Sequence, residues 1–133
     1  MKTTHIFILA FILISSDYSS QRTRIKGNKY EITGKLVNNV SLTPNCGYIA
    51  FATVMEFEII STTMKNYHDK VIPVIVSCPE SYGENFFKLN SIYNLKIADK
   101  KQTSFGWTVP NINIAKKYNL EKDLWVTNVE KQK

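Results

Sequence analysis

The sequence predicts a mainly β domain, a small Greek-key barrel of five or six strands with one short helix. Stretches in which apolar and polar residues alternate recur between residues 29 and 129, as expected for strands with one buried face. A turn-rich segment, Pro79 to Asn90, separates the third predicted strand from the fourth and predicts a turn with a short helix. A β-sandwich is the alternative architecture.

The first two predicted strands carry the clearest period of two. Lys29 to Val37 places Tyr30, Ile32, Gly34 and Leu36 on one face, and Gly34 indicates a bulge or a sharp bend. Gly47 to Ser61 is long enough to bend and to serve two sides of a barrel. Aromatic residues in such alternating segments, Tyr48 among them, are assigned mostly to the core.

The remaining elements complete a recognisable order. The β-branched segment Val71 to Cys78 is the third strand, and Pro73 within it indicates an edge position or a bulge. A fourth strand is expected over Ile92–Ile97 and a short strand or arm over Phe105–Val109. A helical turn over Ile112–Leu120 and a last strand over Leu124–Val129 follow. Three strands, a helix and two strands are typical of the oligonucleotide/oligosaccharide-binding (OB) barrel.

The first twenty residues have the order of a secretory signal peptide. Lys2 precedes the nine-residue apolar run Ile6–Ile14, and small polar residues follow, which are Ser15, Ser16, Ser19 and Ser20. Cleavage after Ser16 or after Ser20, and an uncleaved anchor, remain open. The predicted organisation is a signal peptide (1–20), a flexible basic arm (21–28) and one domain (29–133), in a secreted or periplasmic protein.

The two cysteines are expected to pair. Cys46 and Cys78 are an even count, and an exported protein meets oxidising conditions. A bridge between them would close a loop of roughly thirty residues and stabilise the fold by about 3–4 kcal/mol. Two buried thiols are the alternative.

The charge balance limits the partners. The chain has a formal net charge of +6, and because Lys2 and Asp17 cancel, the value also holds without the first twenty residues. Such a balance favours a protein or an anionic glycan as partner. Export argues against nucleic acid. We expect a monomer without a transmembrane segment in the mature chain.

Catalytic and metal-binding sets are not evident. Apart from His5 in the signal peptide, His68 is the only histidine, and the expectation is no metal and no cofactor. A hydrolase using the paired carboxylates Glu56 and Glu58, two apart on one strand face, is one alternative.

Three segments resemble the small secreted OB-type domains of the netrin-like family. They are CGYIAFATVMEFEI (46–59), IPVIVSCPE (72–80) and FFKLNSIYNL (86–95), within a stretch covering about residues 29–98. The resemblance implies the barrel fold and a protein-binding role. It assigns no site residues, because netrin-like domains normally have more cysteines. Their inhibitory function also needs a specific N-terminal cysteine, and this chain has none there.

The sequence therefore predicts an exported, non-enzymatic binding module. The predicted ligand-binding residues are Tyr82 in the turn after the third strand, Trp107 in the later arm, and Lys100 and Lys101 as a cationic rim. An inhibitor or immunity protein against an exported enzyme is the other alternative.

Overall fold

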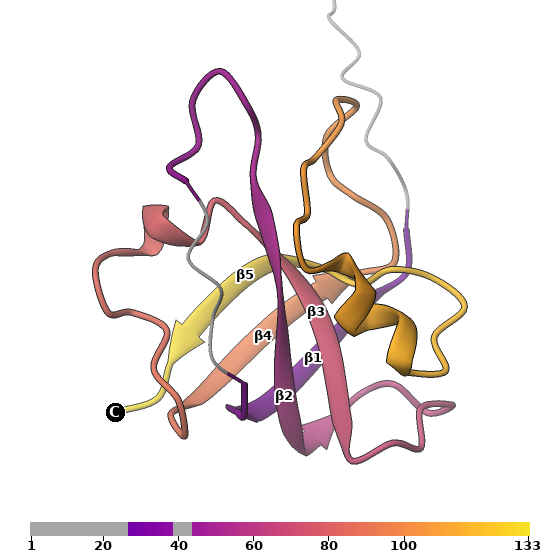
Figure 1. Cartoon of the computed structure of the whole chain (residues 1–133). Coiled ribbons are helices and arrows are strands. Elements are labelled where there is room, and N and C mark those ends of the chain that lie inside the picture. The colour runs from indigo at the N-terminus through magenta and orange to yellow at the C-terminus, as the bar shows by residue number, and fades with distance from the viewer. Residues whose placement is uncertain (1–26, 39–43) are drawn as a thin grey trace, which may run out of the picture.

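The structure, a computed structural model, describes residues 27–38 and 44–133, so the predicted signal peptide and most of the predicted basic arm lie outside the described residues. Five strands form a closed barrel in the order β1-β2-β3-β5-β4 (Figure 1). The strands are β1 (Lys29–Leu36), β2 (Ala52–Thr62), β3 (Val71–Ser77), β4 (Ile92–Ala98) and β5 (Trp125–Lys131). This architecture confirms the predicted fold class.

Strand β2 serves two sides of the barrel, as its length predicts. Residues 52–58 pair with β3, while residues 57–62 pair with β1. The register of β1 against β2 shifts between Thr33 and Gly34, which confirms the predicted irregularity. A side chain at Gly34 would place its Cβ 2.9 Å from the Cβ of Phe57, so the close approach of the two strands requires glycine there.

The barrel closes through a short seam between β3 and β5. These strands run parallel and pair at one position, Ile75 with Trp125, where the Ile75 N–H donates to the Leu124 carbonyl at 2.7 Å. Amide groups two residues apart on a strand point to the same edge. The backbone nitrogen of Pro73, two residues before Ile75, therefore points to the same edge of β3. Because β5 pairs with β3 only at Ile75, the missing N–H of Pro73 costs no hydrogen bond between the strands.

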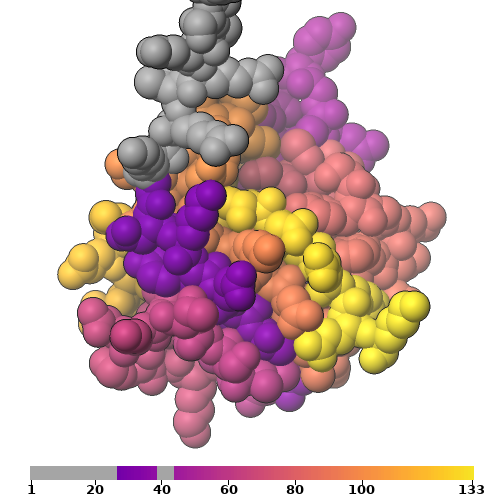
Figure 2. Space-filling view, turned by 180° about the vertical axis from the view of Figure 1, so that it is seen from behind, coloured from indigo at the N-terminus to yellow at the C-terminus, as the bar shows by residue number. Residues whose placement is uncertain are grey.

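The back of the barrel is a continuous three-stranded surface. Strand β4 pairs with both β1 and β5 over most of its length. Figure 2 shows their side chains lying next to one another across this face. Tyr93, Leu95 and Ile97 of β4 point inward and are buried, as the alternation predicts.

A second apolar cluster covers the outside of β2 and β3. Ala52, Val54 and Ile75 are buried there beneath residues of the β4–β5 connection, including Trp107 and the 3₁₀ helix η2 (Ile112–Lys117). Figure 1 shows η2 crossing in front of β3. This outer face is therefore filled by the protein's own chain.

Residues of the loops also bond to the backbone of β2 along the part of its edge that β1 does not reach. Ala52 bonds to the Thr108 backbone, and Val54 bonds through both its N–H and its carbonyl to the side-chain amide of Asn111. The Glu56 N–H donates to the Asn38 side chain at 2.8 Å. These contacts leave the edge without unpaired backbone groups at these positions.

The connection between β3 and β4 supplies the predicted short helix. It is the 3₁₀ helix η1 (Pro79–Tyr82), followed by Phe86 and Phe87, which pack against the interior core as expected. The buried Tyr93 hydroxyl accepts from the Lys88 N–H at 2.7 Å and donates to the Phe86 carbonyl at 2.8 Å. Among residues 27–38 and 44–133, no helix is long and apolar enough to cross a membrane.

Candidate functional site: the loop tips

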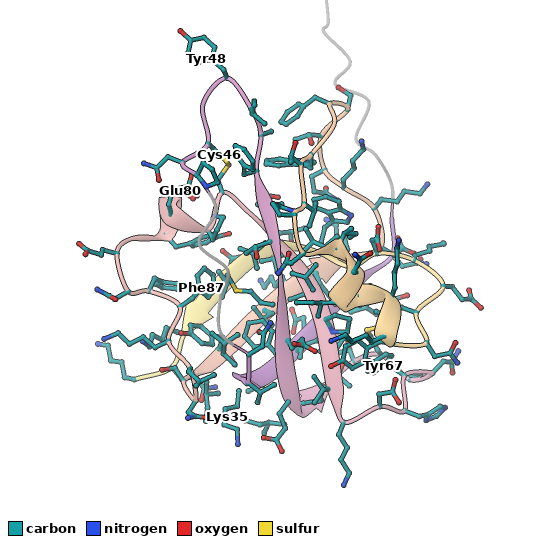
Figure 3. The ribbon with its side chains drawn as sticks, viewed as in Figure 1. Lys35, Cys46, Tyr48, Tyr67, Glu80 and Phe87 are labelled. Atoms are coloured by element: carbon teal, nitrogen blue, oxygen red, sulfur yellow. A yellow bond between two sulfur atoms is a disulfide. The ribbon has the colours of Figure 1, made fainter. Side chains whose placement is uncertain are left out.

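A disulfide braces the loop between β1 and β2. Cys46 and Cys78 are bonded, with their Cα atoms 5.6 Å apart, which confirms the predicted bridge. The Glu80 carboxylate accepts from the Cys46 N–H at 2.6 Å and so ties the loop to η1 a second time. Figure 3 shows Glu80 beside Cys46, below the point where the loop rises from the barrel.

The tip of this loop exposes two large apolar side chains. Tyr48 is fully exposed and Ile49 is 54 % exposed. Figure 3 shows Tyr48 at the extremity of the loop, pointing away from the barrel. Cys46 and Phe51 lie on either side of this tip, and both are attached to Cys78: Cys46 through the disulfide, and Phe51 through its carbonyl, which accepts from the Cys78 N–H at 3.0 Å. The tip therefore protrudes from a fixed base.

The tip of the loop between β4 and β5 exposes a third such side chain, Phe105, at 51 %. Its ring lies 5.1 Å from the ring of Trp107, which in turn lies 6.2 Å from that of Trp125 on β5. Lys101 donates to the Phe105 carbonyl at 3.0 Å, and the Trp107 indole donates to the Thr103 hydroxyl at 2.8 Å. The loop is therefore ordered by its own side chains.

The two loops are joined at their bases. The Thr108 N–H donates to the Ala50 carbonyl at 2.8 Å, and the Ala52 N–H donates to the Thr108 carbonyl at 3.0 Å. Both loops rise from the same end of the barrel (Figure 1). We refer to Tyr48, Ile49 and Phe105 together as the loop-tip surface.

The four predicted ligand-binding residues do not form one patch. Tyr82 is half-buried in an aromatic cluster with Phe86 and Phe87, and burial raises the pKa of its hydroxyl. Figure 1 shows η1, which ends at Tyr82, on the opposite side of the barrel from the β4–β5 loop. Trp107 and Lys101 belong to that loop, and their polar groups bond to other residues of the same loop. The side chain of Lys100 is exposed.

Sequence reasoning did not single out the residues of the loop-tip surface. Assigning Gly47 to Ser61 to one strand placed Tyr48 in an alternating pattern and hence in the core, which is wrong because the strand begins at Ala52. The available signal was the sequence Cys46-Gly47-Tyr48, since a glycine directly after a bridged cysteine favours a loop. Phe105 had a similar signal in the adjacent Gly106.

The paired carboxylates of β2 have separate partners. Glu58 pairs with Lys35 at 2.6 Å, and the hydrogen bond and charge of Lys35 lower the pKa of Glu58. Glu56 accepts from the Tyr118 hydroxyl, and burial together with this contact raises the pKa of Tyr118 to about 12. Neither glutamate lines the clefts that the described residues form beside Tyr67, Asp99, Asn94 and Tyr118.

Potential metal ligands gather at one place in the described part of the chain, where Cys46, Cys78 and Glu80 approach one another. The two sulfur atoms are bonded to each other, so they are not available as thiolate ligands. His68 is exposed in the β2–β3 loop and belongs to no such group.

The fold and these contacts define a disulfide-bonded, five-stranded β-barrel with a protruding pair of loops. No family model matches the chain, and no curated protein or solved structure shows significant similarity to it. The netrin-like resemblance stays a prediction.

Proposed function

We propose that this protein is an exported, non-enzymatic binding module that engages a partner protein through the loop-tip surface. The observation that carries the proposal is the exposure of Tyr48, Ile49 and Phe105 on two loops that are joined at their bases. Single exposed apolar residues are ordinary in soluble proteins. Aromatic side chains presented together on ordered loops are instead typical of protein interfaces, where a few such residues supply most of the binding energy.

The rigidity of the loops supports binding because less conformational entropy is lost on association. The Cys46–Cys78 bridge and the Glu80 contact hold one loop, while Lys101 and Trp107 hold the other. The disulfide and the apolar leader together favour export. With a net charge of +6 on the chain, the expected partner presents an apolar socket with an acidic rim.

The test is capture of a partner from the envelope or culture fluid of the source organism by the immobilised protein. Unmodified protein should retain a stoichiometric partner. The triple variant Y48S/I49S/F105S should lose at least tenfold in retained partner, since loss of an apolar anchor costs on the order of 2 kcal/mol or more.

Ile60→Ser is the matched control, because Ile60 is 56 % exposed and lies near the opposite end of β2. It should retain the partner. Equal retention by the triple variant, or no stoichiometric partner at all, contradicts the proposal. An anionic glycan would instead bind through the lysines. If K100Q/K101Q lost the partner while the triple variant retained it fully, the partner would be a polyanion and not a protein bound at the loop-tip surface.

An inhibitor or immunity protein is a narrower form of the same proposal. Two rigid protruding loops are suited to entering the cleft of an enzyme, which favours this version over a flat docking surface. The discriminating measurement is the activity of the captured partner. An inhibitor should suppress it at equimolar ratio, and the triple variant should not.

A further inference from the structure

A polar groove away from the loop tips remains without an assigned role. Its larger part is a cleft of about 610 Å³ between the start of β1, the β2–β3 loop and the segment entering β5. Four partly buried side chains of this cleft pack onto the interior core, which are Tyr30, Met64, Tyr67 and Leu120. Figure 3 shows Tyr67 below η2, far from Tyr48. The volume is within the range of small-ligand sites.

A second cleft of about 560 Å³ continues the groove. The two clefts share Asp99, Leu120, Glu121 and Lys122, and the second adds Trp125 and the lysines Lys100 and Lys101. Two of the residues predicted to bind a ligand therefore line this groove rather than the loop-tip surface.

A buried carboxylate fixes the geometry between the two clefts. The Asp99 side chain is only 7 % exposed, and it accepts from the Asn28 backbone at 2.8 Å, from the Asn28 amide at 3.0 Å and from Lys122 at 3.3 Å. Desolvation alone would raise the pKa of Asp99, but Lys122 and Asn28 outweigh it and hold the pKa below its usual range. The ionised Asp99 thus positions an amide and an ammonium group at the rim.

The polar groups of the rim match a ligand that both donates and accepts hydrogen bonds. The amides of Asn66 and Asn119 offer donors and acceptors, while Lys65 and Lys122 offer donors. Sugar hydroxyls have this dual character, and the apolar faces of sugar rings suit the aromatic rings of Tyr30, Tyr67 and Trp125.

The charge pattern argues against a strong polyanion. The groove is lined by four lysines and by three carboxylates, which are Lys65, Lys100, Lys101 and Lys122, and Asp99, Glu121 and Asp123. A sulfated glycan or a nucleic acid would meet these carboxylates at close range and be repelled. A neutral ligand meets no such cost.

We infer that this groove binds a neutral oligosaccharide, independently of the protein partner proposed for the loop-tip surface. The direct test uses protein purified after expression of the full chain and neutral hexasaccharides of cellulose, chitin, mannan and laminarin. A heparin hexasaccharide serves as the polyanion. Binding of at least one neutral probe at millimolar concentration should shift the backbone amide resonances of Asn119 and Lys122.

Two variants locate the site. Asn119→Ala and Lys122→Gln should each weaken binding about tenfold, the loss expected for one good hydrogen bond to the ligand. Asn119 is exposed, so the melting temperature of N119A should stay unchanged. K122Q removes the ion pair with Asp99, so its melting temperature should fall slightly, and its loss of affinity is read beside that of N119A. Lys88→Gln makes the same charge change outside the groove and should leave affinity intact.

The inference is overturned if no neutral hexasaccharide binds, if N119A and K122Q bind as well as the unmodified protein, or if only heparin binds and every lysine variant weakens it alike. Phe105→Ser separates the two proposals, because it removes part of the loop-tip surface and should retain the sugar.

Discussion

Asn111 offers a direct test of how the β4–β5 connection is attached to the barrel. It is the residue before η2, a position at which asparagine commonly caps its own helix, yet its side chain makes no such bond. Instead its amide accepts from the Val54 N–H at 2.8 Å and donates to the Val54 carbonyl at 3.0 Å. The Asn111 side chain thus makes the two backbone hydrogen bonds that a neighbouring strand would otherwise make at this point of β2.

Asn111→Ala removes both bonds and leaves two backbone groups of the buried Val54 without partners. Each such group costs about 1–3 kcal/mol, and water entering the truncated site recovers part of it, so the expected loss of unfolding free energy is about 2–4 kcal/mol. With a urea dependence of about 2 kcal/mol per molar, the middle of the range for small domains, the denaturation midpoint should fall by about 1–2 M. Hydrogen exchange of the Val54 amide should accelerate in native conditions.

Asn113→Ala is the matched control. Asn113 is exposed on the helix that follows Asn111, and its replacement by alanine removes the same side-chain amide. It should shift the midpoint by less than about 0.3 M, as surface substitutions do. Equal, small shifts in the two variants, with unchanged exchange at Val54, would refute the assignment of Asn111 as a strand substitute.

Two further outcomes are expected. The double variant C46S/C78S should lose about 3–4 kcal/mol of unfolding free energy in urea titrations, because the bridge restricts the unfolded chain, and amide exchange should accelerate around Tyr48. Tyr118 has a pKa of about 12 in the folded protein, above the usual value near 10, so its stabilising contribution is complete below about pH 10 and is lost as the pH rises towards 12. Tyr118→Phe should remove this part of the alkaline destabilisation, and Tyr48→Phe should not. Equal pH profiles for both variants would contradict the assignment to the buried Tyr118 hydroxyl and its contact with Glu56.

The barrel was predictable because β1 and β4 alternate between buried and more exposed positions, and because special residues fall where the geometry needs them. The period of two identified the inward faces of β1 and β4, and Gly34 marked the irregular pairing with β2. The count of two cysteines, together with the predicted export signal, led to the correct disulfide.

The candidate site was not predictable in the same way, because it depends on contacts between distant segments. Asn111 reaches Val54 across 57 positions, and local patterns carry no trace of such a partner. One signal was present in the sequence. Ala52 and Val54 are apolar on the same face of β2 as Glu56 and Glu58, which indicates that another segment must cover that part of the face. That covering segment is the β4–β5 connection, whose tip carries Phe105.

The parallel seam also determines what the protein's own fluorescence would report. Both tryptophans of the chain, Trp107 and Trp125, lie in or beside the β4–β5 connection, and Trp125 pairs with Ile75 at the single position that closes the barrel. Indole emission therefore responds to the docking of that connection and to the closing of the seam, while β1 and β2 contribute no signal of their own. An unfolding curve followed at these indoles measures when the ring of strands opens, and a second probe on β1 would be needed to learn whether the rest of the sheet opens with it.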